Sequence, residues 1–175
     1  MVQLFLLAML TAAPAEAGKK NKTPPPPNMP SWFMTPPAGC GGGSAIFDPM
    51  MREISKVEAD TNARADLTRQ VQSSVTSMVK THYAKNTGPG GATQSSASAE
   101  STAKTATDMS LLGARTVASE VSEGNLYLMV CIKPESLVAS FNEMAYLDDA
   151  IKTALATEVN TAYGSQAEQL KTLGF

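Results

Sequence analysis

The chain has 175 residues, enough for one domain with appended segments. Its 14 basic and 16 acidic residues give a net charge of −2, which excludes the strongly basic surface typical of nucleic-acid-binding proteins. One histidine and two cysteines are too few for a metal cluster, so no metal or other cofactor is expected.

Residues 1–17 have the pattern of a secretory signal peptide. An apolar run from Leu4 to Ala13 is too short to span a bilayer as a helix, and Ala15-Glu16-Ala17 has the small-x-small form of a signal-peptidase site. No basic residue precedes the run, which departs from the pattern, and the alternative is a buried N-terminal helix or strand. The sequence predicts cleavage after Ala17 and export to the periplasm or cell envelope.

Residues 18–30 form a proline-rich linker. Three lysines precede four consecutive prolines, Pro24 to Pro27, which favour an extended polyproline II spacer. The alternative is a ligand for an aromatic groove in a partner. Lipidation at Cys40 is not expected, because a lipidated cysteine directly follows the apolar run of its signal peptide. Membrane association is left open.

The domain is expected to cover residues 31–163. It begins with Trp32-Phe33 on a proline-flanked arm; such a pair usually packs over the edge of a core, and a binding platform is the alternative. Cys40–Ile46 is predicted to be a strand whose glycines indicate the close approach of another backbone. These glycines do not predict a phosphate-binding loop, because no Gly-Lys-Ser/Thr follows them.

A long helix is predicted over Asp48–Tyr83, with Asp48 as its N-cap and Pro49 at the first helical position. Small residues such as Ala59 and Ala63 crowd its middle, where the helix can lie close to a neighbour. The Gly88-Pro89-Gly90-Gly91 run ends it. Apolar residues at helical spacing form the expected core-facing stripe: Met50, Ile54, Val57, Val71, Val75, Met78 and Val79.

Shorter elements complete the domain. A weak alanine-rich helix is predicted over about 96–107, followed by strands over Met109–Val121 and Leu126–Ile132. The second strand is apolar on both faces, which is typical of a central strand. A last helix is predicted over Glu135–Tyr163, and residues 164–175 form a short tail that is frayed or weakly helical.

This order, β-α-α-β-β-α, predicts a two-layer α+β domain in which a small, mainly antiparallel three-stranded sheet packs against the long helix and the C-terminal helix. One helical layer covers only one face of a sheet. The other face needs a cover, either the Trp32 arm with the alanine-rich helix or a partner, so Trp32, Tyr127 and Met129 are candidate interface residues. The expected core residues are Ile54, Val57, Val71, Val75, Leu128, Val130, Phe141, Ile151 and Leu155.

Few residues could carry catalysis. A nucleophilic triad needs a base, and the only histidine, His82, lies on the apolar face of the long helix, where packing is the commoner role. The carboxylate pairs Asp148-Asp149 and Glu58/Asp66 are of a kind that is usually solvated. No catalytic, cofactor-binding or metal-binding residue is predicted, and no small-molecule substrate is evident.

Two features are structural candidates. Arg64 falls inside the apolar stripe, and we expect it either to pair with Asp60 one turn earlier or to tie the helix to the sheet backbone. Cys40 and Cys131 both lie in predicted strands, and an exported protein meets an oxidising compartment. If those strands are neighbours the thiols can form a disulfide, but the sequence does not determine the strand order.

Three groups of segments, taken in their order along the chain, resemble the LPP-twenty lipoprotein family. This family includes a flagellar outer-membrane lipoprotein. The three groups are Pro30-Ser31-Trp32 with Pro36-Pro37; Gly41–Ala45 with Glu58–Leu67 and Ser74–Lys80; and Leu111-Leu112-Gly113 with Gly124–Val130 and Pro134–Leu137. The resemblance implies a compact α+β envelope lipoprotein, and some members of the family build rings or discs around the flagellar motor. The chain departs from the family in having no lipidated cysteine at its expected mature N-terminus.

The expected function is that of a non-enzymatic structural or assembly component of the cell envelope, with further copies of the chain or other envelope proteins as partners. The alternative is a periplasmic binding module for peptidoglycan or for an envelope protein.

Overall fold

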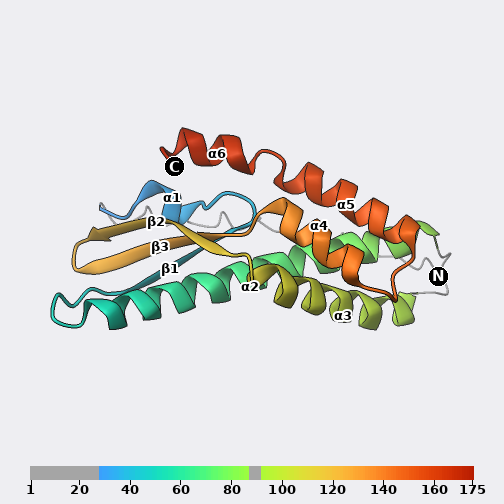
Figure 1. Ribbon diagram of the computed structural model, residues 1–175, viewed down its shortest axis with the longest axis horizontal. Helices are drawn as coiled ribbons and strands as arrows, with labels where there is room; N and C mark the ends of the chain where they lie inside the picture. The colour runs from blue at the N-terminus through green and yellow to red at the C-terminus, as the bar shows by residue number, and fades with distance from the viewer. Residues whose placement is uncertain (1–27, 87–91) are drawn as a thin grey trace, which may run out of the picture.

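The computed structural model describes residues 28–86 and 92–175 (Figure 1). The predicted signal peptide and most of the predicted linker lie outside these residues. Among the described helices, none is both long and apolar enough to cross a membrane. The elements in chain order are α1 (Ser31–Met34), β1 (Cys40–Ile46), α2 (Arg52–Asn86), α3 (Ala92–Leu111), β2 (Arg115–Ser122), β3 (Asn125–Cys131), α4 (Pro134–Glu143), α5 (Asp149–Tyr163) and α6 (Gln166–Thr172).

The three strands form one antiparallel sheet in the order β1-β3-β2, so β3 is the central strand, as its unbroken apolar sequence predicted. Figure 1 shows α2 running along the molecule, with the sheet beside its first half and α3 beside its second half. The predicted α+β class, with a small antiparallel three-stranded sheet packed against helices, is confirmed.

β1 lies directly on the backbone of α2, because neither element places a large side chain between them. A Cβ atom added at Gly43 would lie 2.1 Å from the Ala63 amide nitrogen and 2.2 Å from the Ala59 carbonyl oxygen. A Cβ atom at Gly41 would lie 2.4 Å from the Leu67 amide nitrogen. The close approach predicted from the glycines of the strand and the alanines of the helix is confirmed.

Side chains of α2 also bond to the outer edge of β1. The Gly42 amide donates to Asp66 Oδ2 (3.1 Å), and Asn62 Nδ2 donates to the Ser44 carbonyl oxygen (2.9 Å). Without such contacts, the unpaired N–H and C=O groups of an edge strand can pair with a strand of another molecule. This edge of the sheet is therefore closed by the helix that supports it.

Alternate residues of β3 face opposite sides of the sheet. On the side of α2, Leu128 packs with Ala59, and Val130 joins the main core. On the other side, called the outer face here, Met129 packs with Trp32. Both faces of the central strand are thus covered within the described chain.

Beyond the sheet, the second half of α2 packs with α3, α4 and α5 around the main core (Figure 1). α3 buries alanines such as Ala99, Ala103 and Ala106, so its backbone can lie close to α2. Seven of the nine expected core residues are buried: Val71, Val75, Leu128, Val130, Phe141, Ile151 and Leu155.

The other two expected core residues, Ile54 and Val57, are a wrong prediction, because their side chains are 63% and 66% exposed. The residues that face the sheet in this part of α2 are Ser55, Ala59 and Ala63, which are all buried. With about 100° of rotation per residue, Ile54 and Val57 project from the opposite side of the helix. Direct backbone contact with β1 requires small residues here and leaves the larger apolar ones in solvent.

The start of the long helix also differs from the prediction. Asp48 does not cap α2: its carboxylate accepts a hydrogen bond from the Met50 amide (2.8 Å) in a turn, and the helix runs over Arg52–Asn86. The Asp48 amide donates to Ser55 Oγ (3.1 Å), which anchors this turn to the first residues of the helix.

The predicted single helix over Glu135–Tyr163 is two helices, α4 and α5. α4 ends at Glu143, where the Met144 amide donates to the Phe141 carbonyl oxygen (3.2 Å). Asp148 then caps α5 by accepting from the Ile151 amide (2.8 Å). The bend lets both helices pack on one core, because Met144 itself is buried there.

The elements between α2 and β3 have different bounds as well. The predicted strand Met109–Val121 is shorter, because α3 continues to Leu111 and β2 begins at Arg115. α3 has 20 residues rather than the short span over 96–107, and it packs on α2 rather than on the outer face.

A methyl group at Gly43 tests the contact between β1 and α2. We expect Gly43→Ala to lower the free energy of unfolding by about 3 kcal/mol or more, because the added Cβ meets helix backbone that cannot move aside. Gly42→Ala is the matched control in the same strand, since the nearest atoms to its Cβ would belong to the Phe33 ring, at 3.2 Å. Urea unfolding measures both, and equal losses would contradict the proposed contact.

Candidate functional site

A disulfide joins the two cysteines across the sheet. Cys40 and Cys131 are paired residues of β1 and β3, their Cα atoms lie 4.0 Å apart, and their sulfur atoms are bonded (2.03 Å). The sequence allowed this bond only if the two strands were neighbours, and they are. Cys40 is fully buried and Cys131 nearly so.

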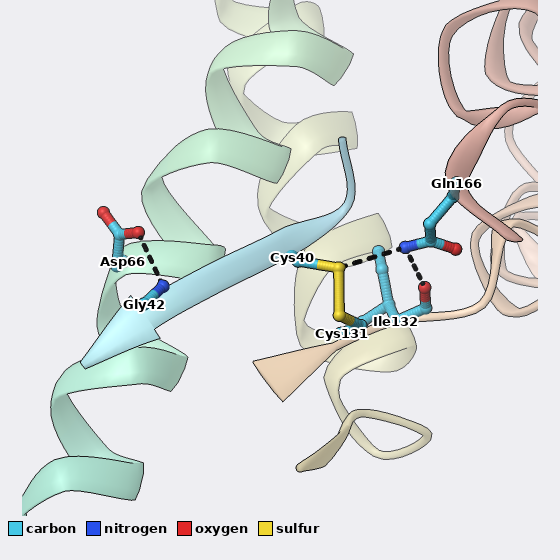
Figure 2. The surroundings of a disulfide bond; sticks show 6 residues. All are labelled: Cys40, Gly42, Asp66, Cys131, Ile132 and Gln166. Atoms are coloured by element: carbon cyan, nitrogen blue, oxygen red, sulfur yellow. Dashed lines mark hydrogen bonds between the residues drawn. A yellow bond between two sulfur atoms is a disulfide. The ribbon is translucent and has the colours of Figure 1, made fainter. Parts of the chain in front are cut away.

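Gln166 of α6 lies over this disulfide (Figure 2). Its Nε2 donates to the Ile132 carbonyl oxygen (3.0 Å) and lies 3.5 Å from Cys40 Sγ. Gln166 is buried although it is polar, so these contacts anchor α6 to the end of the sheet. No sequence pattern indicated this residue, because it falls in the segment predicted to be a tail.

The outer face of the sheet carries a second apolar cluster. Trp32 of α1 packs there with Tyr127 and Met129, and Leu170 and Leu173 from the C-terminal segment pack against them. Aromatic edges are also in contact: the Phe33 and Tyr127 ring centroids lie 4.8 Å apart, and those of Trp32 and Phe175 lie 6.3 Å apart. Figure 1 shows α6 on the same side of the sheet as α1.

This cluster corrects the expectation of an interface at Trp32, Tyr127 and Met129. Their side chains are 6%, 7% and 0% exposed, because α1 and α6 cover the face from within the chain. The Trp32 arm supplies part of this cover, as predicted, and the tail supplies the part that was expected from the alanine-rich helix or from a partner. A charge at Met129 would therefore disrupt the fold, as would a charge at Leu128.

Arg64 makes both of the contacts considered for it. Its Nε donates to Asp60 Oδ2 (2.7 Å), and its NH2 group lies 3.5 Å from the Ala114 carbonyl oxygen, just before β2. The other Asp60 oxygen accepts from Thr116 Oγ1 of β2 (3.1 Å). Arg64 and Asp60 are partly exposed, so we treat this group as a tie between helix and strand that contributes little stability.

The remaining ionisable candidates lie on several elements. His82 is half-buried near the end of α2, Asp148 is the cap of α5, and Glu58 is exposed. Asp66, which the sequence analysis treated as solvated, bonds to β1. In the described part of the chain, no group of three or more His, Cys, Asp or Glu side chains is placed to hold a metal ion.

Five exposed apolar side chains lie close together in the sequence where β1 leads into α2. We call this set the apolar end: Ile46, Met50, Met51, Ile54 and Val57, whose side chains are between 52% and 93% exposed. The connection that carries them is held in place, because the Phe47 amide donates to the Gly124 carbonyl oxygen (2.8 Å) in the turn between β2 and β3. The apolar end is thus displayed by a well-bonded turn.

A groove separates α6 from the segment before β1. It has a volume of about 540 Å³ and is lined by prolines and small residues on one side and by hydroxyl, amide and carboxylate groups of α6 on the other. The residues that line it are Thr35, Pro36, Pro37, Ala38, Ser165, Glu168, Gln169, Thr172 and Leu173.

No protein-family model matches this sequence, and none of the curated proteins is similar to it. The resemblance to the LPP-twenty family therefore stays a prediction that depends on the segments quoted above.

The disulfide should dominate the stability of the domain. Cys40 and Cys131 are 91 residues apart, and closing a loop of this size stabilises a fold by about 4–5 kcal/mol in the chain-entropy model. We expect the double variant Cys40→Ala/Cys131→Ala to lose about this free energy of unfolding, measured with urea. Two thiols titrating in the unfolded, unreduced wild type would contradict the bond.

Burial raises the pKa of Tyr163 above its ordinary value of 10.0, and a hydrogen bond with Ser74 opposes the rise. Since the folded state holds this proton more tightly than the unfolded state, the contribution to stability is complete below about pH 10 and is lost as the pH rises through the raised pKa. We expect Tyr163→Phe to make the alkaline fall in unfolding free energy shallower. Tyr146→Phe, at an exposed tyrosine, is the control, and identical pH profiles for both variants would refute the assignment.

Proposed function

We propose that the protein is an exported, non-enzymatic structural or assembly component of the cell envelope, similar in role to LPP-twenty lipoproteins. The observation that carries this proposal is the apolar end. Its five side chains lie in water on a domain whose other large apolar residues are mostly buried. Exposed apolar side chains that gather in one place mark surfaces that bind another protein.

The disulfide supports the exported location. Protein disulfides persist in oxidising compartments such as the bacterial periplasm and are rare in the cytosol. Cys40 and Cys131 close such a bond in the core of the sheet, in agreement with the secretory pattern of residues 1–17.

The polar side chains of the α2 segment that resembles the family support a scaffold role. Asp60 and Arg64 contact β2 or the residue before it, while Asn62 and Asp66 bond to β1. These side chains hold the helix to both edges of the sheet. A rigid platform of this kind suits a subunit that presents fixed surfaces to its neighbours.

Charges at the apolar end test the proposal in the organism that encodes the protein. We expect the tagged wild-type chain to fractionate with the envelope and to elute, after mild detergent extraction, well above the mass of a single chain. The double variant Met50→Glu/Ile54→Glu should remain folded, because both side chains are exposed, but should elute without envelope partners, at a mass well below that of the wild-type complex.

Leu112→Glu is the matched control, since Leu112 is 90% exposed but lies at the end of α3, away from the apolar end. It should elute like the wild type. A wild-type chain that is free in the extract, or found in the cytoplasm, would overturn the proposal.

The second candidate is a periplasmic binding module, and the groove beside α6 is the observation that favours it. Its hydroxyl and amide groups, from Thr35, Ser165 and Gln169, suit a glycan or peptide ligand. Calorimetric titration with peptidoglycan fragments tests this function. Binding that is lost in Gln169→Ala, by a protein that stays monomeric, would place this function first.

A further inference from the structure

The two edges of the sheet differ in how their backbone groups are satisfied. The outer edge of β1 bonds to Asp66 and Asn62 of α2. The other edge is β2, and across residues 28–86 and 92–175 no element besides β3 bonds to the backbone of Arg115–Val121. An open edge of this kind is a template for another strand.

The side chains along β2 limit which strand fits. Arg115 is paired with Cys131, Ala118 with Met129, and Glu120 with Tyr127. Paired residues of an antiparallel ladder project to the same face, so Arg115 and Glu120 both lie on the outer face, near opposite ends of the strand. Both are exposed, and neither is in an ion pair within the described residues.

We propose that β2 pairs antiparallel with β2 of a second copy, so that two sheets join into one of six strands. This inference rests on the proposed function and names the partner and the surface of the assembly. The β-bulge between Thr116 and Ala118 supplies one extra residue. With Ala118 opposite Ala118 of the second copy, Arg115 of each copy lies opposite Glu120 of the other.

Charge complementarity selects a second copy as the occupant. A strand with a positive charge near its start and a negative charge near its end is complementary to itself when antiparallel, and the two-fold axis makes both ion pairs at once. Like charges would meet in a parallel pairing. A β-bulge and charged side chains disfavour most pairings at a sheet edge. In this register, however, the bulge aligns the opposite charges of the two copies, so this pairing is permitted.

The other candidate for the edge is the segment that precedes Asn28. The Asn28 carbonyl oxygen accepts from Ser122 Oγ, and the Asn28 side chain bonds to Glu123, so the described chain begins beside the end of β2. Residues before Asn28 that occupied the edge would keep the full chain monomeric, which is an outcome of the test.

Charge exchange tests the pairing in the full, oxidised chain by sedimentation equilibrium over a concentration series. We expect a dimer for the wild type. Arg115→Glu and Glu120→Arg should each raise the dimer dissociation constant about tenfold or more, because two attractive pairs become two repulsive ones. An equimolar mixture of these single variants should dimerise like the wild type, since both pairs are then complementary, and so should the double variant Arg115→Glu/Glu120→Arg.

Glu143→Arg is the control for an added positive charge at an exposed site outside the strand, and it should not change the dimer. Circular dichroism confirms that each variant is folded. A monomeric wild type overturns the inference, and so does a dimer that neither exchange weakens. A dimer that neither exchange weakens overturns this pairing but not the proposed assembly role. A dimer that responds to the exchanges as expected, in a protein that forms no envelope complex, overturns the assembly role but not this pairing.

Discussion

The contact between the backbone of β1 and the backbone of α2 organises this domain. Gly41 and Gly43 leave no side chain between strand and helix, and Ala59 and Ala63 accept the strand against the helix itself. This approach brings the β1 edge within reach of polar side chains of α2. It also places β1 beside β3 in the register that sets Cys40 opposite Cys131. The disulfide between these two residues then links β1 covalently to β3.

Much of this arrangement was predictable from the sequence. The bounds of β1 were predicted correctly, its glycines indicated the close approach of another backbone, and the central place of β3 followed from its apolar residues on both faces. The disulfide was predictable only as a condition, because strand order depends on long-range packing that a single sequence does not reveal. The helical stripe was reliable at Val71 and Val75, where α2 packs on other helices.

The failures have physical causes that belong to particular residues. Near the sheet, α2 needs small residues for backbone contact, so Ile54 and Val57 lie opposite the buried row. The residues that face the sheet recur every four positions, at Ser55, Ala59, Ala63 and Leu67. This spacing marks the buried face, but serine and alanine are also common on solvent-facing sides of helices. The role of α6 was missed because Leu170 and Leu173 are too few to form a stripe, although they cover the outer face.

Apart from the groove beside α6, these features leave two surfaces of the described chain for protein partners. The outer face is covered from within, and the β1 edge is closed by α2. What remains is the apolar end, carried by the firm turn before α2, and the open edge of β2. The two lie on different elements, so a subunit could contact a second copy through one and another envelope component through the other.

Oxidative footprinting of methionine tests most directly whether a partner covers the apolar end. Met50 is 93% exposed and Met51 52% in the isolated chain, whereas Met129 is fully buried and serves as the internal standard. The account predicts that hydrogen peroxide oxidises Met50 and Met51 rapidly in the purified chain and much more slowly in intact envelopes, with Met129 protected in both. Equal rates at Met50 in the two preparations would contradict it.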